Sequence, residues 1–214
     1  MDQPTGIPVM LHLDGWKCLI VGGGSVAVRR SRSLVEAGAQ VTVLAPEIDP
    51  AIEKIGATIV CEQFDADKHA LNEYALVVVA TSNVQTNEAI THECDQMPDP
   101  PLVNRADRPS AGDLTFMSSH RDGPLTVAVH TGGASANAAA RIRSILADSL
   151  DPVWGQLLAL AFPARQRIQA AVSDPAKRTE LLRRLTDDNA IQTLKQGGES
   201  GLKAFYDDIM KDLA

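Results

Sequence analysis

The fold is decided by residues 17–44, KCLIVGGGSVAVRRSRSLVEAGAQVTVL. Lys17–Val21 is a short apolar run that predicts a buried parallel strand. The glycines of Gly22–Gly24 follow at once, and the next stretch has helical character until Gly38, which suits a helix C-cap. Val41–Leu44 is rich in β-branched residues and predicts a second strand. The stretch therefore has the length of one βαβ unit, about 30 residues.

The alternation of strand and helix continues toward the C-terminus. Thr58–Cys61 predicts a weak strand and Leu76–Ala80 a strongly buried one. Asn83–Asp95 predicts a helix, and Pro101–Val103 begins a further short strand. Strands that alternate with helices predict an α/β fold, so we expect a Rossmann-type parallel sheet domain over residues 1–113.

The pattern changes after residue 113. Leu114–Ser118 and Leu125–His130 predict two strands joined by a polar turn, and Ala136–Leu150 predicts a helix. One side of this helix carries three apolar residues at helical spacing: Ile142, Ile145 and Leu146. Residues 114–150 therefore predict a small α+β segment. Its two-stranded ribbon is marginally stable alone, so we expect it to pack against a partner chain or against the helices of the C-terminal region.

A helical C-terminal region is predicted over residues 151–214. Its first helix follows Pro152, and its second runs from Ala176 to about Gln196. The segment GGESG then interrupts the helical pattern before a last helix over Leu202–Leu213.

The composition limits the class of protein. The chain has 214 residues, of which 44% are hydrophobic and 22% charged, which predicts a globular protein with a sizeable core. A net charge of −7 disfavours general binding to nucleic acid or to an anionic membrane surface. The apolar runs are too short to span a bilayer, and the N-terminal sequence does not resemble a signal peptide. No nucleic-acid or membrane partner is therefore expected.

The cysteines are few and scattered, at Cys18, Cys61 and Cys94, without a C-x-x-C pair. They predict neither a disulfide framework nor a structural zinc site, and they suit a reducing cytoplasm. Cys and His do not cluster at metal-ligand spacings, so no metal-binding residue is predicted.

A dinucleotide motif, Gly22-x-Gly24-x-x-Ala27, directly follows the first predicted strand. Gly22 suits a tight turn, Gly24 lets a pyrophosphate approach the backbone, and Ala27 lets the helix pack closely on the sheet. The helix N-terminus then offers free N–H groups to the phosphates. The alternative is a glycine turn that binds nothing. The cofactor-binding residues predicted from this turn are Gly22, Gly23, Gly24, Ser25 and Val26.

The end of the second predicted strand bears on the choice between NAD and NADP. Ala45 and Pro46 occupy the place where NAD-binding sites often carry Asp or Glu, and Glu47 and Asp49 follow. No Arg follows the strand to receive a 2′-phosphate, so NAD is the expected cofactor. We predict that Ala45 and Pro46 contact it.

Thr81 follows the strand Leu76–Ala80, at a carboxyl end where ligands bind in open α/β sheets. It is predicted to contact the cofactor. Ser82 or Asn83 is alternatively, or also, an N-cap of the next helix.

Several motifs together resemble one family. PVMLHLDGWKCLIVGGGSVAVRRSRSLVEAGAQVTVLAP resembles the opening of precorrin-2 dehydrogenases, the NAD-binding part of siroheme synthases. ATSNVQTN, VNRAD and GPLTVAVHTGGAS resemble later segments of the family in the same order and spacing. The resemblance covers about residues 7–150. It implies NAD-dependent oxidation of precorrin-2 to sirohydrochlorin in siroheme biosynthesis. It also implies a homodimer, with residues 114–150 as the dimerisation segment.

The resemblance also implies a functional carboxylate at Asp107, which matches the Asp of the family's N-x-x-D segment. Such a carboxylate could accept a proton when the macrocycle is oxidised. The alternative is an Asx-type turn before Pro109. Asn104 and Arg105, in the same segment, are predicted to bind the substrate.

The turn after the strand Leu125–His130 is a second candidate substrate site. Backbone N–H groups of Thr131, Gly132 and Gly133 could hold a substrate carboxylate, and His130 beside them could bind one too. The alternative is an ordinary glycine turn with Ser135 as helix N-cap.

Two other functions remain open from the sequence. Some members of the family also insert iron, which would make the protein a bifunctional dehydrogenase and ferrochelatase. A third possibility is a regulatory module that binds the dinucleotide without turnover.

Overall fold

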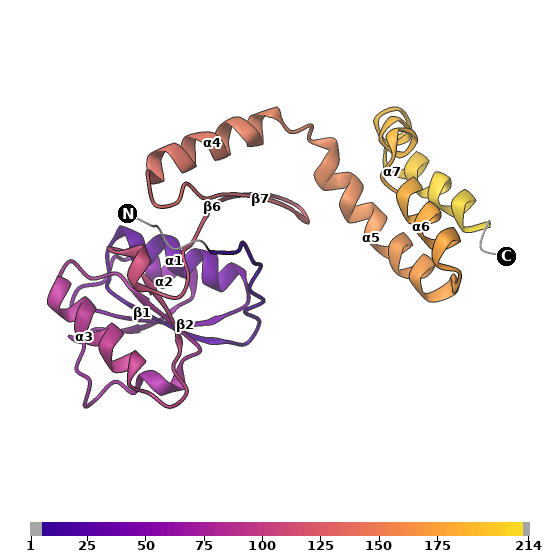
Figure 1. Cartoon of the computed structure of the whole chain (residues 1–214). Coiled ribbons are helices and arrows are strands. Elements are labelled where there is room, and N and C mark those ends of the chain that lie inside the picture. Colours follow the sequence, from indigo (N-terminus) through magenta and orange to yellow (C-terminus); the bar gives the residue numbers. More distant parts are fainter. Residues whose placement is uncertain (1–5, 212–214) are drawn as a thin grey trace. The chain divides into compact units, whose positions relative to one another are not determined.

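The computed structural model describes residues 6–211 (Figure 1). The chain forms two compact units that divide between Phe116 and Met117. The predicted segments 114–150 and 151–214 fall almost entirely within the second unit, so their separation stays a prediction.

The first unit is built on a five-stranded parallel sheet with the strand order β3-β2-β1-β4-β5. The strands are β1 (Lys17–Val21), β2 (Gln40–Leu44), β3 (Thr58–Val60), β4 (Leu76–Val79) and β5 (Leu102–Arg105). The order reverses between β1 and β4, which creates the switch point where open α/β sheets bind ligands. The Rossmann-type fold predicted from the sequence is confirmed.

Helices cover both faces of this sheet. They are α1 (Ser25–Glu36), α2 (Ala51–Ile55) and α3 (Val84–Asp95), with short 3₁₀ turns η1 (Leu71–Glu73) and η2 (Pro109–Ala111). Alternate residues of β4 show the two faces, because Val78 belongs to the core under α1 and α2 while Val77 belongs to the core under α3. Burial on both faces is the reason that β4 is apolar at every position.

The second unit begins with a two-stranded antiparallel ribbon, β6 (Ser118–Asp122) and β7 (Leu125–Val129). The predicted strand Leu114–Ser118 is wrong in position, because Leu114 and Phe116 instead pack against the core of the first unit. The ribbon turns through only two residues, and Gly123 takes a φ of 56° that suits the first position of such a turn.

Four helices complete the second unit: α4 (Ala136–Ser149), α5 (Val153–Ala171), α6 (Pro175–Arg184) and α7 (Asp188–Lys211). The single helix predicted from Ala176 to about Gln196 is wrong, since α6 ends at Arg184. The predicted break at GGESG is confirmed at Gly198, where φ 60° and ψ −161° are not helical, so that α7 consists of two helices that meet at a sharp kink. Leu194 and Leu202, which lie on the two sides of this break, are both buried in the same core. The predicted end of the last helix at Leu213 lies outside the described residues.

None of the described helices has by itself both the length and the hydropathy that a bilayer crossing requires. Taken together, α4 and α5 meet both requirements, but the chain bends by 74° between them.

Candidate functional site

A cavity of about 770 Å³ lies at the carboxyl ends of β1, β2 and β4 in the first unit. Three segments that follow these strands supply most of its wall: Gly22–Gly24, Ala45–Asp49 and Ala80–Asn83. Gln63, Phe64 and Thr86 also line it. The volume is in the range of sites that hold a cofactor-sized ligand.

The three glycines of the turn have different structural roles. Gly22 has φ 125°, and a Cβ atom there would lie 2.4 Å from the carbonyl oxygen of Ala80. A Cβ atom on Gly23 would lie 2.0 Å from the carbonyl oxygen of Glu47. Gly24 is different, because a Cβ atom there would meet nothing within 4 Å. Gly22 and Gly23 are therefore required by packing, whereas Gly24 leaves its space open to a ligand.

The N-terminus of α1 is free to bind an anion. Its N-cap residue is Gly24, and no side chain caps the helix by a hydrogen bond. The first N–H groups of a helix lack intrahelical partners and carry a partial positive charge. The site fits the diphosphate of a dinucleotide, because it combines these donors with the open space at Gly24. Ser25 and Val26 begin this helix but do not line the cavity.

The residues that follow β2 form one wall of the cavity. Ala45 and Pro46 line the wall, as expected, and the carboxylate-bearing residues Glu47 and Asp49 line it beside them. Two hydrogen bonds hold Asp49 in place. Its N–H donates to the carbonyl oxygen of Gly23 at 2.9 Å, and its carboxylate accepts from the N–H of Ala51 at 2.9 Å.

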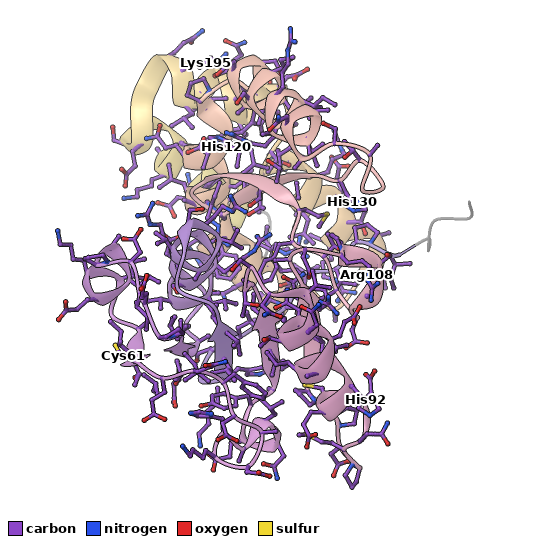
Figure 2. All side chains as sticks on the ribbon, turned by 90° about the vertical axis from the view of Figure 1, so that its left-hand side faces the viewer. Cys61, His92, Arg108, His120, His130 and Lys195 are labelled. Atoms are coloured by element: carbon purple, nitrogen blue, oxygen red, sulfur yellow. The ribbon has the colours of Figure 1, made fainter. Side chains whose placement is uncertain are left out.

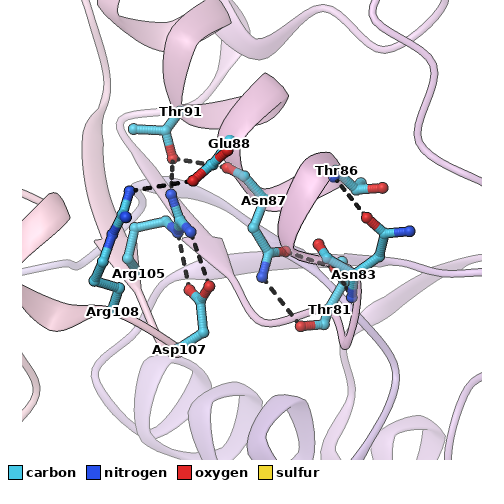
Figure 3. Close-up of polar contacts among 9 residues, drawn as sticks. All are labelled: Thr81, Asn83, Thr86, Asn87, Glu88, Thr91, Arg105, Asp107 and Arg108. Carbon is cyan, nitrogen blue, oxygen red and sulfur yellow. Dashed lines mark hydrogen bonds and ion pairs between the residues drawn. The ribbon is translucent and has the colours of Figure 1, made fainter.

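Thr81 lines the cavity at the end of β4, as predicted, and its side chain is fixed by hydrogen bonds. Its hydroxyl donates to Oδ1 of Asn87 at 2.5 Å, and its carbonyl oxygen accepts from Nδ2 of Asn87 at 3.1 Å (Figure 3). The N-cap of α3 is Asn83, whose side chain accepts from the N–H of Thr86 at 2.9 Å. The N-cap role therefore belongs to Asn83, whereas the cofactor contact of Thr81 stays a prediction.

Asp107 forms a paired ionic contact with Arg105 (Figure 3). Nε and Nη2 of Arg105 donate to the two carboxylate oxygens at 2.9 and 2.8 Å. The side chain of Arg105 is 1% exposed and that of Asp107 is 28% exposed. Nη1 of Arg105 donates to Oγ1 of Thr91, 3.2 Å away on α3. Arg105 was predicted to bind the substrate, but its guanidinium is buried and already bonded, which favours a supporting role beneath Asp107.

The pKa of Asp107 is lowered to about 2, chiefly because Arg105 donates hydrogen bonds to both carboxylate oxygens. A general base is most efficient when its pKa lies near the working pH. Asp107 is therefore ionised at neutral pH, and its expected role as a proton acceptor stays a prediction.

Asn104, also predicted to bind the substrate, is 2% exposed. Its Nδ2 donates to the carbonyl oxygen of Leu114 at 2.9 Å, so it ties β5 to the segment that follows η2. Its Oδ1 is buried without a hydrogen-bond partner among the described residues. This placement indicates a structural bridge more than a ligand contact.

The glycine turn of the second unit is largely satisfied by its own side chains. The hydroxyl of Thr131 donates to the carbonyl oxygen of Ser135 at 3.0 Å and accepts from its N–H at 3.3 Å. Nδ1 of His130, labelled in Figure 2, accepts from the N–H of Gly132 at 3.3 Å. Gly132 and Gly133 both have positive φ, of 62° and 81°. Substrate binding by these four residues stays a prediction.

Within residues 6–211, no group of three or more His, Cys, Asp or Glu residues is placed to hold a metal ion. The three cysteines are free thiols. Burial raises the pKa of Cys18 and of Cys94 to about 11, and Cys61 lies exposed in the first unit (Figure 2).

Sequence reasoning missed several residues of the site. Gln63 and Phe64 follow β3 and line the cavity, although nothing in their local sequence marks them. Asn87 was quoted only as part of a motif, but it is 0% exposed and bonded to Thr81. Asn87 lies four residues after Asn83, which places the two on the same side of the helix that follows β4. This spacing was the available signal that Asn87 lies near the strand end.

The sheet, the glycine turn and the cavity define a dinucleotide-binding protein of the Rossmann type. Residues 9–118 match the family described as "Putative NAD(P)-binding", and the chain belongs to this family, whose cofactor is a nicotinamide dinucleotide.

Comparison with known proteins supports the family resemblance that the motifs indicate. The chain is 34% identical to a siroheme synthase of Saccharophagus degradans over 75% of its own length and 35% of that protein. It is 32% identical to a siroheme synthase of Methylococcus capsulatus over 89% of its own length and 40% of that protein. The structure of SirC, a precorrin-2 dehydrogenase, matches with a TM-score of 0.75 and 25% identity, over 95% of this chain and all of that one. The resemblance indicated by the sequence is confirmed, and the chain spans less than half of these siroheme synthases.

Proposed function

We propose that this protein is a dehydrogenase that oxidises precorrin-2 to sirohydrochlorin with NAD in siroheme biosynthesis. The observation that carries the proposal is the uncapped N-terminus of α1 beside the open face of Gly24, in a cavity of about 770 Å³. The match to SirC along nearly the whole chain supports the substrate. When bound, the nicotinamide would supply the hydride acceptor.

Residues of the first unit would have separate roles in cofactor binding and in the oxidation. The N–H groups at the start of α1 bind the diphosphate, and Thr81, fixed by Asn87, lines the wall at the end of β4. Asp107 stays ionised, because Arg105 holds both of its oxygens. A fixed negative charge stabilises positive charge that develops on the macrocycle as a hydride leaves. Two hydrogens are lost in all, one as hydride and one as a proton that passes to solvent.

An anaerobic assay with precorrin-2 and NAD tests this function by the absorbance of NADH. The wild-type protein should form NADH, and Asp107→Asn should lower kcat about 100-fold or more, because the fixed charge is lost while the shape is kept. NAD binding without NADH formation would instead support the regulatory module. A parallel arm with ferrous or cobaltous ion would reveal a chelatase, by loss of sirohydrochlorin faster than in a protein-free control.

NAD, rather than NADP, is the proposed cofactor. Glu47 and Asp49 line the cavity beyond β2, where the 2′-phosphate of NADP would meet carboxylates. Glu47→Lys should raise the affinity for NADP relative to NAD about tenfold, measured by calorimetry. Glu53→Lys makes the same charge change on α2 outside the cavity wall and should leave the ratio unchanged. A wild-type protein that binds NADP more tightly than NAD would contradict the assignment.

We also propose that the protein is a homodimer. The three apolar residues predicted on one side of α4 are exposed: Ile142 (42%), Ile145 (58%) and Leu146 (41%). A contiguous apolar stripe on a helix marks a surface that another chain covers. Ile145→Lys should produce a monomer by light scattering, whereas Asn137→Lys, on the polar side of the helix, should not. A monomeric wild-type protein at micromolar concentration would refute the proposal.

The three free cysteines suit the reducing cytoplasm, which we propose as the place of action. Fractionation of cells that express the protein would test it.

A further inference from the structure

One half-buried arginine of the first unit has no anionic partner. Arg30 lies in the second turn of α1, and its Nε is buried without a hydrogen-bond partner. No atom of its guanidinium makes a hydrogen bond or an ion pair with any residue between positions 6 and 211. The guanidinium instead lies over the ring of Phe116, 4.0 Å from the ring centroid. Arg105 of the same unit differs, because the carboxylate of Asp107 holds it.

The guanidinium of Arg30 is a charge that the fold only partly stabilises. Burial, and then the like charge of Arg29, lower its pKa to about 10, so it is still a cation at neutral pH. An aromatic ring attracts such a cation but does not replace the hydrogen bonds that water or a carboxylate would accept from it. A partly buried cation attracts an anion more strongly than an exposed one, because the effective dielectric is lower. Arg30 therefore lacks a counter-charge that a ligand could supply.

The other charged residues of α1 make the surroundings of Arg30 positive. Arg29 and Arg32 are exposed, and their side chains make no hydrogen bond or ion pair within the described part of the chain. The acidic residue of this helix, Glu36, occupies its last position. The chain as a whole has a net charge of −7, so a local group of cations would favour an anionic ligand that the rest of the protein repels.

The chain after η2 shows on which side of α1 the guanidinium lies. The carbonyl oxygen of Leu114 accepts from Nδ2 of Asn104 at 2.9 Å, so this segment runs back along β5. Phe116 follows two residues later and packs with Leu114 against the core under α1 and α2. Phe116 and the guanidinium of Arg30 therefore lie on the side of α1 toward β5, the strand that Asp107 follows.

We propose that Arg30 is a specificity-determining residue that binds a carboxylate of the tetrapyrrole substrate, with Phe116 orienting its guanidinium. The inference rests on the proposed function and assigns a substrate contact within it. In the proposed binding mode the adenosine lies beyond β2, so the nicotinamide extends toward β4 and β5, on the same side of α1 as Arg30. Precorrin-2 carries several carboxylates, and arginine binds a carboxylate through two parallel hydrogen bonds. The contrasting role is a brace that only holds Phe116 on the core.

The first experiment compares two variants of the full chain in the anaerobic assay at saturating NAD. Arg30→Gln should raise the KM for precorrin-2 about tenfold and leave kcat within about twofold, because a contact remote from the reacting carbon is equal in the ground and transition states. Lys54→Gln removes the same charge from an exposed position on α2 and should leave KM within about twofold of wild type. Equal KM values for the two variants would overturn the proposal.

The second experiment measures binding without turnover. The calorimetric Kd for the product, sirohydrochlorin, should rise about tenfold in Arg30→Gln, and about threefold in Arg30→Lys, which keeps the charge but loses the two-pronged geometry. The Kd for NAD should stay within about 1.5-fold of wild type in both variants, because Arg30 does not line the dinucleotide cavity. An unchanged Kd for sirohydrochlorin in Arg30→Gln would overturn the proposal.

Arg30→Met separates a substrate contact from a structural brace. Methionine keeps an apolar contact with Phe116 and removes the unpaired charge, so the Tm should stay equal or rise while the KM for precorrin-2 increases about tenfold. A brace predicts a lower Tm with unchanged KM, and that result would overturn the proposal. Failure of the wild-type protein to form NADH would instead refute the proposed function, whereas NADH formation with unaltered KM in all three Arg30 variants would overturn this inference alone.

Discussion

Two glycine turns in this protein each lead from a strand into a helix, but the N-termini of the two helices differ in their capping. After β1, Gly24 is the N-cap of α1 and makes no side-chain capping bond. After β7, Ser135 is the N-cap of α4, and its hydroxyl accepts from the N–H of Ala138 at 3.1 Å. The hydroxyl of Thr131 closes the second turn further.

The comparison teaches that a glycine turn before a helix is not by itself an anion site. The donors of the first turn are available because the residue that would cap them is glycine. The donors of the second are partly satisfied by Ser135. The two turns can be tested separately, since the first unit contains Trp16 and the second Trp154, the only tryptophans in the chain.

The largest effect is expected from Gly23→Ala in the first turn. The new Cβ atom would lie 2.0 Å from the backbone oxygen of Glu47, so the chain must shift there. We expect a loss of about 3 kcal/mol in the free energy of unfolding of the first unit. Urea unfolding followed by Trp16 in a Trp154→Phe background measures it. Gly24→Ala, which has open space, is the control, and equal stability of the two variants would contradict the packing argument.

The second-largest effect is expected in how the free energy of unfolding of the first unit depends on pH. The folded pKa of Asp107, about 2, is below its unfolded value of 3.8, so the ionic contact with Arg105 stabilises the fold above pH 4. This stabilisation, about 2 kcal/mol, is lost as the pH falls from about 4 to 2. Urea unfolding at several pH values should show this loss in wild type but not in Asp107→Asn. Parallel curves for the two proteins would argue against the low pKa.

A third effect separates ligand binding from stability. Gly24→Ala should fold normally but raise the Kd for NAD about tenfold or more, because the methyl group occupies the space left open for the diphosphate. Gly132→Ala in the second turn, where φ is 62°, should cost about 1 kcal/mol of stability and leave the Kd unchanged. Calorimetry with NAD decides, and an unaltered Kd for Gly24→Ala would refute the assignment of the first turn.

The smallest effect is expected at the cap of α4. Ser135→Ala removes the bond to Ala138 and should lower the stability of the second unit by about 1 kcal/mol, whereas Ser135→Gly should cost only a few tenths. The fluorescence of Trp154 in a Trp16→Phe background reports on this unit. A larger loss for Gly than for Ala would show that the bond does not cap the helix.

Elements that depend on local sequence signals were predicted more accurately than elements that depend on contacts between distant segments. The first βαβ unit was placed to within a residue or two, because the apolar run, the glycines and the helical pattern are local signals. The first strand of the ribbon was misplaced, since Leu114 and Phe116 are apolar for a different reason: they pack against the core of the first unit. The break at Gly198 was predicted correctly, because a glycine-rich segment is a local signal.

The sequence alone determined the Rossmann-type sheet, the position of the dinucleotide turn and the family, because each depends on residues that are adjacent in the chain. Only the tertiary structure decided what the residues of the motif do. It buried Arg105 beside Asp107, lowered the pKa of that carboxyl, and bonded Asn87 to Thr81. Burial and pairing depend on segments that are distant in sequence. A sequence motif can therefore locate a site without showing which of its residues contact a ligand and which position other residues.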